Sequence, residues 1–123
     1  EKLCPVVAIL PYKTFTDAVA KAKANLLVEG AGHSAAVHSN DEKNIREAGV
    51  ELPISRLVVN QPSSLTAGGS LTNGFAPTTT LGCGSWGGNS ISENLDYKHL
   101  MNVSRIGKVI TGKKMPTDEE IFS

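Results

Sequence analysis

The feature that most limits the fold of this chain is an alternation of two hydrophobic periods over residues 1–60. Residues 5–10 form a short, continuous apolar run rich in β-branched side chains, which is typical of a strand buried on both faces. Apolar side chains then recur at helical spacing, at Phe15, Val19, Ala22 and Leu26. This change of period predicts a strand followed by an amphipathic helix.

The same alternation continues along the chain. Two further strands are predicted at residues 33–38 and 56–60, with a short polar helix over residues 41–48 between them. Each connection between successive strands then contains a helix, as parallel neighbours require. The sequence therefore predicts an α/β fold whose small parallel sheet has the order βαβαβ and right-handed crossovers.

Capping residues mark the ends of the predicted helices. Thr14 is expected to begin the first helix, because Asp17 lies three residues later, in the first turn that acidic side chains favour. Ser39 and Glu42 form a second possible capping box. Gly49 is well placed to end the second helix.

Residues 61–94 carry no sustained period and are dominated by Gly, Ser, Thr, Asn and Pro. Seven of the chain's twelve glycines lie between residues 68 and 88, a density far above the usual ~7%. A flexible linker is one interpretation, but linkers rarely carry side chains such as Phe75 and Trp86, which favours an ordered, irregular segment with a function. Apolar side chains return at residues 98–110, where an extended arm or edge strand is expected before a polar tail.

The string GCGSWG at residues 82–87 matches the pattern G-x-G-x-x-G. Pyrophosphate binding by this pattern needs a clear strand before it and a helix N-terminus after it, and because the sequence predicts neither, a tight, close-packed turn is favoured. Cys83 lies in this turn and is either a nucleophile, with His33 or His38 as its base, or a small buried apolar residue. His33 in turn either faces a cleft or is a structural histidine.

Composition excludes several classes of protein. Twelve Lys and Arg residues balance twelve Asp and Glu residues, so the basic excess typical of nucleic-acid binding is missing. Two cysteines are too few for a disulfide-stapled scaffold and lack metal-ligand spacing, and no apolar run approaches the ~20 residues that span a bilayer. No signal peptide opens the chain, although its first residue is Glu1 rather than Met. We expect a cytoplasmic protein without nucleic-acid, membrane or metal partners.

Several segments together resemble the CoA-acylating branch of the aldehyde dehydrogenases. They are EKLCPV at residues 1–6, GHSA at 32–35, RLVVN at 56–60 and, above all, the long and specific TLGCGSWGGNSISEN at 80–94. The resemblance extends to about residue 110. It implies an NAD-dependent enzyme that oxidises an aldehyde through a cysteine thiohemiacetal and passes the resulting acyl thioester to coenzyme A.

The resemblance also implies an incomplete chain, because family members are several times longer and their dinucleotide-binding domain and nucleophilic cysteine precede this region. Neither Cys4 nor Cys83 occupies the nucleophile position, so this fragment alone is expected to be inactive. Residues 1–97 would belong to the C-terminal part of the catalytic domain. Residues 98–123 would form an oligomerisation strand, which docks on another copy, and a polar tail.

The resemblance assigns two groups of site residues. In the superfamily motif Glu-x-Phe-x-Pro, Glu1 matches the glutamate whose carboxylate accepts hydrogen bonds from the nicotinamide ribose hydroxyls. Leu3 departs from the motif, since it stands where an aromatic residue packs near the nicotinamide. The aldehyde and acyl-transfer pocket is expected near Pro62, Ser63, Ser64, Gly82 and Cys83.

Two rival interpretations remain open, namely a non-catalytic interaction domain that retains the dehydrogenase fold, and a self-contained cysteine hydrolase that uses Cys83. The aldehyde itself is not identified. The segments at residues 98–106 and 116–121 are more similar to the succinate-semialdehyde type than to the bifunctional, alcohol-forming type.

Overall fold

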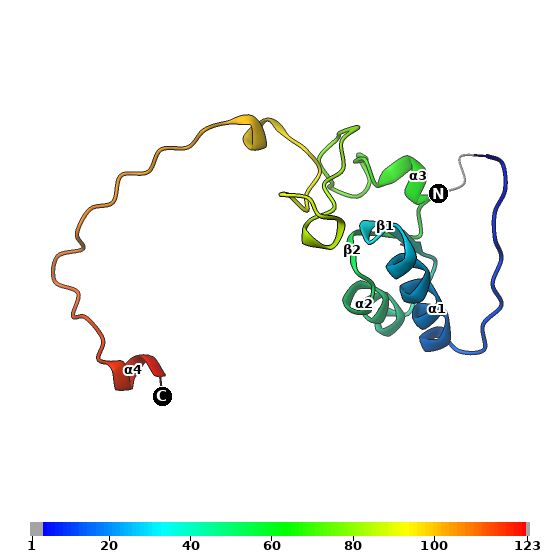
Figure 1. The fold of residues 1–123 in the computed structure, drawn as a ribbon, viewed down its shortest axis with the longest axis horizontal. Coiled ribbons are helices and arrows are strands. Elements are labelled where there is room, and N and C mark those ends of the chain that lie inside the picture. The colour runs from blue at the N-terminus through cyan, green and yellow to red at the C-terminus, as the bar shows by residue number, and fades with distance from the viewer. Residues whose placement is uncertain (1–3, 123) are drawn as a thin grey trace.

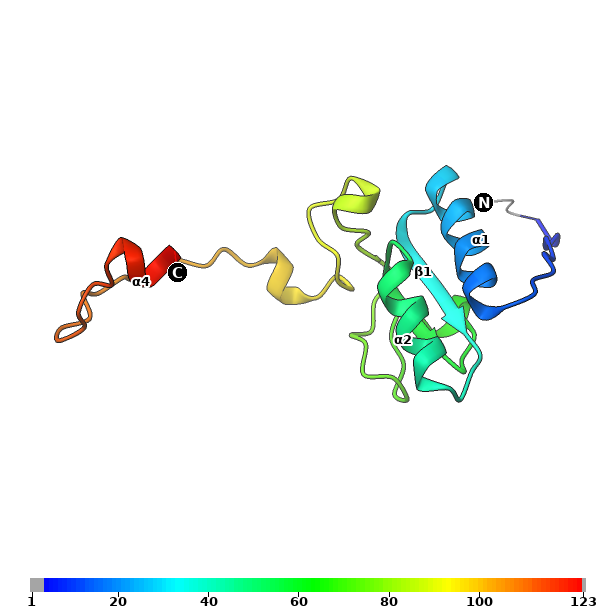
Figure 2. The ribbon, with the colours of Figure 1, turned by 90° about the horizontal axis from the view of Figure 1, so that it is seen from below.

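The structure is a computed structural model, which describes residues 4–122. Its centre is a parallel sheet of two strands, β1 (Gly32–Val37) and β2 (Ile54–Val59), in which Gly32 is opposite Ile54 and Val37 is opposite Val59. Helix α1 (Phe15–Val28) precedes β1, and helix α2 (Glu42–Glu51) connects the two strands (Figures 1 and 2). The central unit is thus βαβ, with one helix before it.

The two faces of the sheet have different covers. On one face, Ala35 and Leu57 pack against a buried cluster to which both long helices contribute, with Val19, Ala48, Leu52 and Ile54 as its members. On the other face lie Ser34 and Arg56, which are opposite each other in the ladder. Arg56 bonds there to the irregular segment that follows β2. The sheet is therefore held between helices and an irregular layer.

The irregular layer contains only short helices. Helix α3 (Ser63–Thr66) contacts both strands, and two 3-10 turns follow, η1 (Ser85–Gly87) and η2 (Tyr97–Leu100). The antiparallel bridge between Leu81 and Asn94 closes the glycine-rich loop between them. The sequence predicted an ordered, irregular segment, and the structure confirms it. Contacts between turns and strands order this segment, which contains no long helix and no strand of the sheet.

The predicted α/β class and the parallel pairing of residues 33–38 with residues 56–60 are confirmed. The N-terminal cap of α1 is also confirmed, because the Asp17 backbone N–H donates to Thr14 Oγ1 at 3.2 Å. Both strands begin one or two residues earlier than the periodicity indicated. These features all depend on residues close together in the sequence.

The helix predicted over residues 41–48 is confirmed as α2 (Glu42–Glu51), but the predicted cap at Ser39 and the predicted stop at Gly49 are wrong. Asp41 is the cap of α2, since its Oδ1 accepts the Lys43 N–H at 2.9 Å, whereas Ser39 Oγ accepts the N–H of Asp41. Gly49 lies inside the helix, which continues to Glu51. The helix continues because Leu52, the next residue, is buried in the core and its N–H bonds to Ala48 O, which holds the last turn closed.

The strand predicted at residues 5–10 is absent, so the sheet is βαβ rather than βαβαβ. The segment is extended, but it pairs with no strand in the described residues, and Val7 and Ile9 are 80% and 86% exposed. An apolar run signals that burial is favourable, but a strand also needs a neighbour with free backbone groups. Residues 5–10 pair with neither outer edge of the described two-stranded sheet, so their backbone groups join no ladder.

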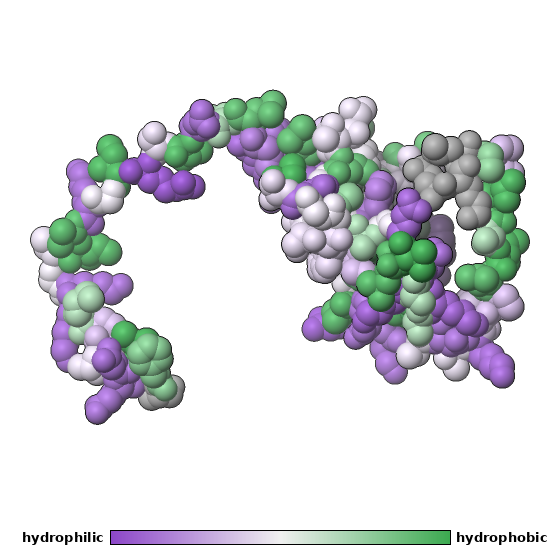
Figure 3. All heavy atoms as spheres, viewed as in Figure 1, coloured by the Kyte–Doolittle hydropathy of each residue, from purple (hydrophilic) through white to green (hydrophobic). Residues whose placement is uncertain are grey.

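The C-terminal segment forms the predicted arm, without a strand ladder. Residues 101–110 run extended away from the sheet, and helix α4 (Asp118–Phe122) lies near the far end (Figure 1). Apolar side chains are spread along the arm and reach solvent, among them Val103, Ile106 and Val109 (Figure 3). Over the described residues, no helix has the length and apolarity needed to cross a membrane.

Replacing Thr14 by Ala tests the cap of α1. The substitution removes the oxygen that accepts the Asp17 N–H, so the free energy of unfolding is expected to fall by about 1 kcal/mol. Urea denaturation followed by circular dichroism measures the change. The matched control is Thr16→Ala, an exposed position inside the same helix, where a change within about 0.5 kcal/mol is expected. Equal losses in both variants would contradict the capping role.

Candidate functional site

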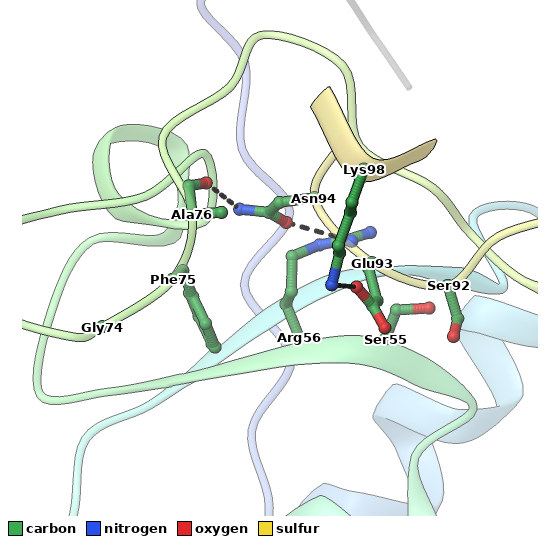
Figure 4. A pocket seen from close by; sticks show the side chains of 9 residues that line it. All are labelled: Ser55, Arg56, Gly74, Phe75, Ala76, Ser92, Glu93, Asn94 and Lys98. Carbon is green, nitrogen blue, oxygen red and sulfur yellow. Dashed lines mark hydrogen bonds and ion pairs between the residues drawn. The ribbon is translucent and has the colours of Figure 1, made fainter. Parts of the chain in front are cut away.

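A buried arginine joins the sheet to the irregular layer. Arg56 lies in the middle of β2 and is only 3% exposed. Its Nε donates to Ser34 Oγ at 3.1 Å, and its Nη2 donates to Gly82 O at 2.8 Å and to His33 O at 3.2 Å. Its Nη1 donates to Asn94 Oδ1 at 3.4 Å (Figure 4). One side chain thus holds β1, the glycine-rich loop and the segment after it.

No carboxylate among residues 4–122 pairs with this guanidinium. The ion pairs within residues 4–122 join Asp17, Glu51 and Glu93 to lysines or, for Glu93, also to His99, and none includes Arg56. Backbone carbonyls, one hydroxyl and one amide oxygen satisfy the donors of Arg56 but carry no net charge. Within the described residues the positive charge therefore has no carboxylate partner, and it lies under the surface of the irregular layer, where low polarisability strengthens its field.

Asn94 extends the network of Arg56 to two further turns. Its Nδ2 donates to Ala67 O at 3.0 Å and to Ala76 O at 2.8 Å, while its Oδ1 accepts from Arg56 (Figure 4). Asn94 is 7% exposed, so these carbonyls have little access to water. The amide thus replaces the backbone ladder that this irregular region lacks.

Glycines let the loop lie directly on β1. Gly32 has φ +83°, and a Cβ there would come within 2.0 Å of Cys83 O. A Cβ at Gly82 would come within 2.5 Å of Ile91 O, because the Gly82 N–H already bonds to Glu93 O at 3.0 Å. The expectation of a tight, close-packed turn at residues 82–87 is confirmed, since these glycines meet the chain's own backbone.

Two neighbouring clefts lie beside this loop, and His33 lines both. The serine cleft has a volume of about 440 Å³ and lies beside α3; its lining includes Ser34, Ser63, Ser64, Gly68, Thr78 and Thr79. The Cys83 cleft has a volume of about 480 Å³ and is bordered by the end of α1, with Cys83, Trp86 and Asn89 among its lining residues.

The predicted pocket residues are only partly brought together. Ser63 and Ser64 line the serine cleft, whereas Cys83 lines its neighbour. Pro62 is the exposed residue before α3, and Gly82 is buried as a partner of Arg56. Glu1 and Leu3, the predicted nicotinamide contacts, lie outside the described residues.

Cys83 is held by its own loop. Its thiol donates weakly to Leu81 O at 3.9 Å, and its backbone N–H donates to Asn89 Oδ1 at 2.9 Å. His33 lines the same cleft, but no hydrogen bond joins the two side chains, and His38 follows the opposite end of β1. Within residues 4–122 this arrangement supplies no base bonded to the thiol, so the predicted activation of Cys83 by His33 or His38 finds no support in the hydrogen bonds.

A third hollow, the Lys98 pocket, has a volume of about 330 Å³ and lies on another side of Arg56 (Figure 4). Glu93 pairs there with Lys98 and with His99 Nε2. The hydrogen bond from Lys98 lowers the pKa of Glu93, and Glu93 raises the pKa of Lys98. Ser55 Oγ is buried beside them without a hydrogen-bond partner in the described chain.

Sequence reasoning missed Arg56 and Asn94 as the organising residues of the site. The available signal was Arg56 itself, a charged side chain at the start of the apolar stretch RLVVN. A charge that is buried in a strand needs hydrogen-bond partners, which marks such a residue as an organiser. Which partners it finds depends on Gly82 and Asn94, 26 and 38 residues further on.

No cluster of metal-ligating side chains occurs among residues 4–122.

Comparison with curated proteins finds relatives along nearly the whole chain. An acetylating succinate-semialdehyde dehydrogenase from Clostridium kluyveri is 64% identical over 122 residues, which are 99% of this chain and 27% of the relative. A sulfoacetaldehyde dehydrogenase from Acholeplasma is 39% identical over 99% of this chain and 25% of its own length. No family model matches. The chain thus spans about a quarter of the length of these relatives.

Solved structures agree with these relatives. A probable aldehyde dehydrogenase from Listeria monocytogenes has a TM-score of 0.83 and 39% identity, over 98% of this chain and 25% of that chain. An acetylating aldehyde dehydrogenase from Geobacillus thermoglucosidasius has a TM-score of 0.74 and 34% identity, over 87% and 23%. The resemblance inferred from the sequence is confirmed, and the chain is homologous to a segment of the acylating aldehyde dehydrogenases.

Replacing Asn94 by Ala tests the network around Arg56. The substitution leaves one buried carbonyl, one partly buried carbonyl and one guanidinium N–H without partners, so the free energy of unfolding is expected to fall by about 3 kcal/mol. Urea denaturation measures the loss. The control is Asn25→Ala on the exposed side of α1, where a change within about 0.5 kcal/mol is expected. A loss below about 1 kcal/mol at Asn94 would show that the network is not a main support of the fold.

Proposed function

We propose that this chain is part of an NAD-dependent enzyme that converts an aldehyde and coenzyme A to an acyl-CoA through a cysteine thioester. The observation that carries the proposal is the 64% identity, over 99% of the chain, with an acetylating succinate-semialdehyde dehydrogenase. The attacking cysteine is proposed to lie outside this chain. In support, Cys4 is exposed in a bend, and Cys83 Sγ bonds only to Leu81 O in the described structure.

The serine cleft is the proposed location of the acyl group. Hydroxyl groups of Ser63, Ser64 and Thr79 line it, and their side chains have no hydrogen-bond partner within residues 4–122. These hydroxyls can donate to a carbonyl oxygen and accept from a thiol. The Arg56 network holds the wall of the cleft, because it fixes His33 and Ser34 through hydrogen bonds.

Substrate and cofactor assignments follow the same proposal. Succinate semialdehyde is the favoured aldehyde, because the relative at 64% identity is named for it. NAD would accept the hydride, with Glu1 on its ribose hydroxyls and Leu3 beside the nicotinamide. Coenzyme A would be the co-substrate that receives the acyl group.

The arm is the proposed contact between copies of the enzyme. We assign residues 1–97 to the catalytic domain and residues 98–123 to an oligomerisation arm and polar tail. In support, the arm exposes apolar side chains along an extended backbone whose N–H and C=O groups are free to pair (Figure 3). Docking on another copy would bury both. We propose a cytoplasmic location, with no role for membrane or nucleic acid.

The proposed activity is tested with the full-length protein that contains this chain. NADH formation from succinate semialdehyde is expected to depend on coenzyme A, and mass spectrometry is expected to detect the matching acyl-CoA. The CoA dependence follows because the thioester needs a thiol acceptor. Release of free acid at an equal rate without coenzyme A would contradict acyl transfer. Absence of any aldehyde oxidation would favour the rival interpretation, a non-catalytic domain that retains the fold.

The role of Glu1 is tested in the same full-length protein. Glu1→Ala removes both acceptors for the ribose hydroxyls, so the KM for NAD is expected to rise about tenfold while the melting temperature stays within a few degrees. Initial rates at varied NAD measure the effect. Glu119→Gln, in the exposed first turn of α4, is the control and should leave the KM unchanged. An unchanged KM and rate for Glu1→Ala would defeat this assignment.

A further inference from the structure

We propose that the serine cleft binds an anionic group at the far end of the aldehyde substrate, and that Ser34 donates the decisive hydrogen bond to it. This inference rests on the proposed function and adds the means by which the substrate is selected. It adds the place where the terminal carboxylate of such a short aldehyde is bound and the residue that binds it.

The lining of the cleft suits an anion. Its polar members are His33 and five hydroxyl residues, and no Asp or Glu is among its lining residues. The other members are Leu65, Ala67, Gly68, Gly69 and Leu81, which carry no charge. A volume of about 440 Å³ lies within the ~300–1,000 Å³ common for small-molecule sites. A carboxylate only accepts hydrogen bonds, so a cleft of hydroxyl donors without acidic side chains matches its chemistry.

Arg56 controls the direction in which Ser34 donates. The guanidinium Nε donates to Ser34 Oγ at 3.1 Å, so one lone pair of the hydroxyl is occupied from inside the protein. Within the described chain this is the only side-chain hydrogen bond of Ser34. The hydroxyl proton is therefore free to turn into the cleft that Ser34 lines. A donor that itself accepts from a cation is polarised, which strengthens the bond that it donates.

The positive charge of Arg56 also favours an anion in the serine cleft. The guanidinium is buried, and no carboxylate among residues 4–122 neutralises it. An anion in the serine cleft would lie one hydroxyl away from this charge and would supply the missing counter-charge. The Lys98 pocket also touches Arg56, but its other cation, Lys98, is already paired with the Glu93 carboxylate that lines the same pocket, whereas no carboxylate lines the serine cleft. The serine cleft is thus the better anion site of the two.

A carboxylate of the aldehyde and a phosphate of coenzyme A share this chemistry. We assign the cleft to the carboxylate, because the serine cleft also holds the hydroxyls of Ser63 and Ser64 proposed for the acyl group. A four-carbon acyl chain would place its carbonyl and its carboxylate in one cleft of this size. A Ser34 variant distinguishes the two sources, because loss of a carboxylate contact weakens use of the aldehyde, whereas loss of a phosphate contact raises the KM for coenzyme A.

The experiment compares two four-carbon aldehydes in the full-length enzyme, succinate semialdehyde with a carboxylate and butanal without one. Ser34→Ala is expected to lower kcat/KM for succinate semialdehyde about 10- to 100-fold, because it removes a hydrogen bond to a charged group. Butanal is expected to lose less than about threefold. Ser34→Thr keeps the hydroxyl and should restore most of the preference. Ser90→Ala, an exposed serine outside the cleft, is the matched control and should leave the preference unchanged.

The comparison separates this inference from the proposed function. Equal losses for both aldehydes in Ser34→Ala would overturn the inference, because a purely structural role lowers both rates together. A raised KM for coenzyme A with an unchanged preference between aldehydes would overturn it in favour of a phosphate. CoA-dependent oxidation of butanal by the unaltered enzyme, without preference for succinate semialdehyde, would overturn the inference and leave the proposed function standing. No CoA-dependent oxidation of either aldehyde would overturn both.

Discussion

The hydrogen bonds of the buried Arg56 guanidinium are the interaction on which the rest of this structure depends. A sheet of two strands has little surface to organise a long irregular segment, and the core cluster on its helical face leaves the other face open. Arg56 covers that face by bonding to carbonyls of β1 and of the glycine-rich loop, and to Asn94. An arginine suits this position because its planar fork carries five donors that reach several chain segments at once.

Close backbone contacts make the second contribution to order in the irregular layer. Gly32 and Gly82 lie where a Cβ would collide with backbone atoms. Only glycine at these two positions therefore allows the loop at residues 80–94 to approach β1 this closely. The loop then carries Cys83 and Trp86 into the wall of one cleft, while α3 brings Ser63 and Ser64 to the other. The two clefts meet at His33, whose carbonyl Arg56 holds. The same contacts therefore stabilise the layer and shape the clefts.

The segments at both ends of the described chain differ from this centre. Residues 5–10 are apolar, and residues 101–110 carry five apolar side chains among polar ones; both segments are extended, exposed and unpaired in the structure. The chain spans about a quarter of the length of its relatives. Burial of these segments against further protein would remove apolar surface from water and satisfy their backbone groups. Their exposure fits the proposal that catalysis requires polypeptide beyond residues 1–123.

The sequence by itself determined the local elements and the family. Periodicity and the Thr14 cap predicted α1, the two apolar runs predicted the parallel pair, and the stretch at residues 80–94 identified the relatives. Only the tertiary structure decided that residues 5–10 pair with neither strand of the described sheet, that Arg56 faces the loop, and that Ser34 lines a cleft with Ser63. The physical reason is that helix and strand patterns depend on neighbours a few residues apart, whereas a buried charge is satisfied by partners more than twenty residues away.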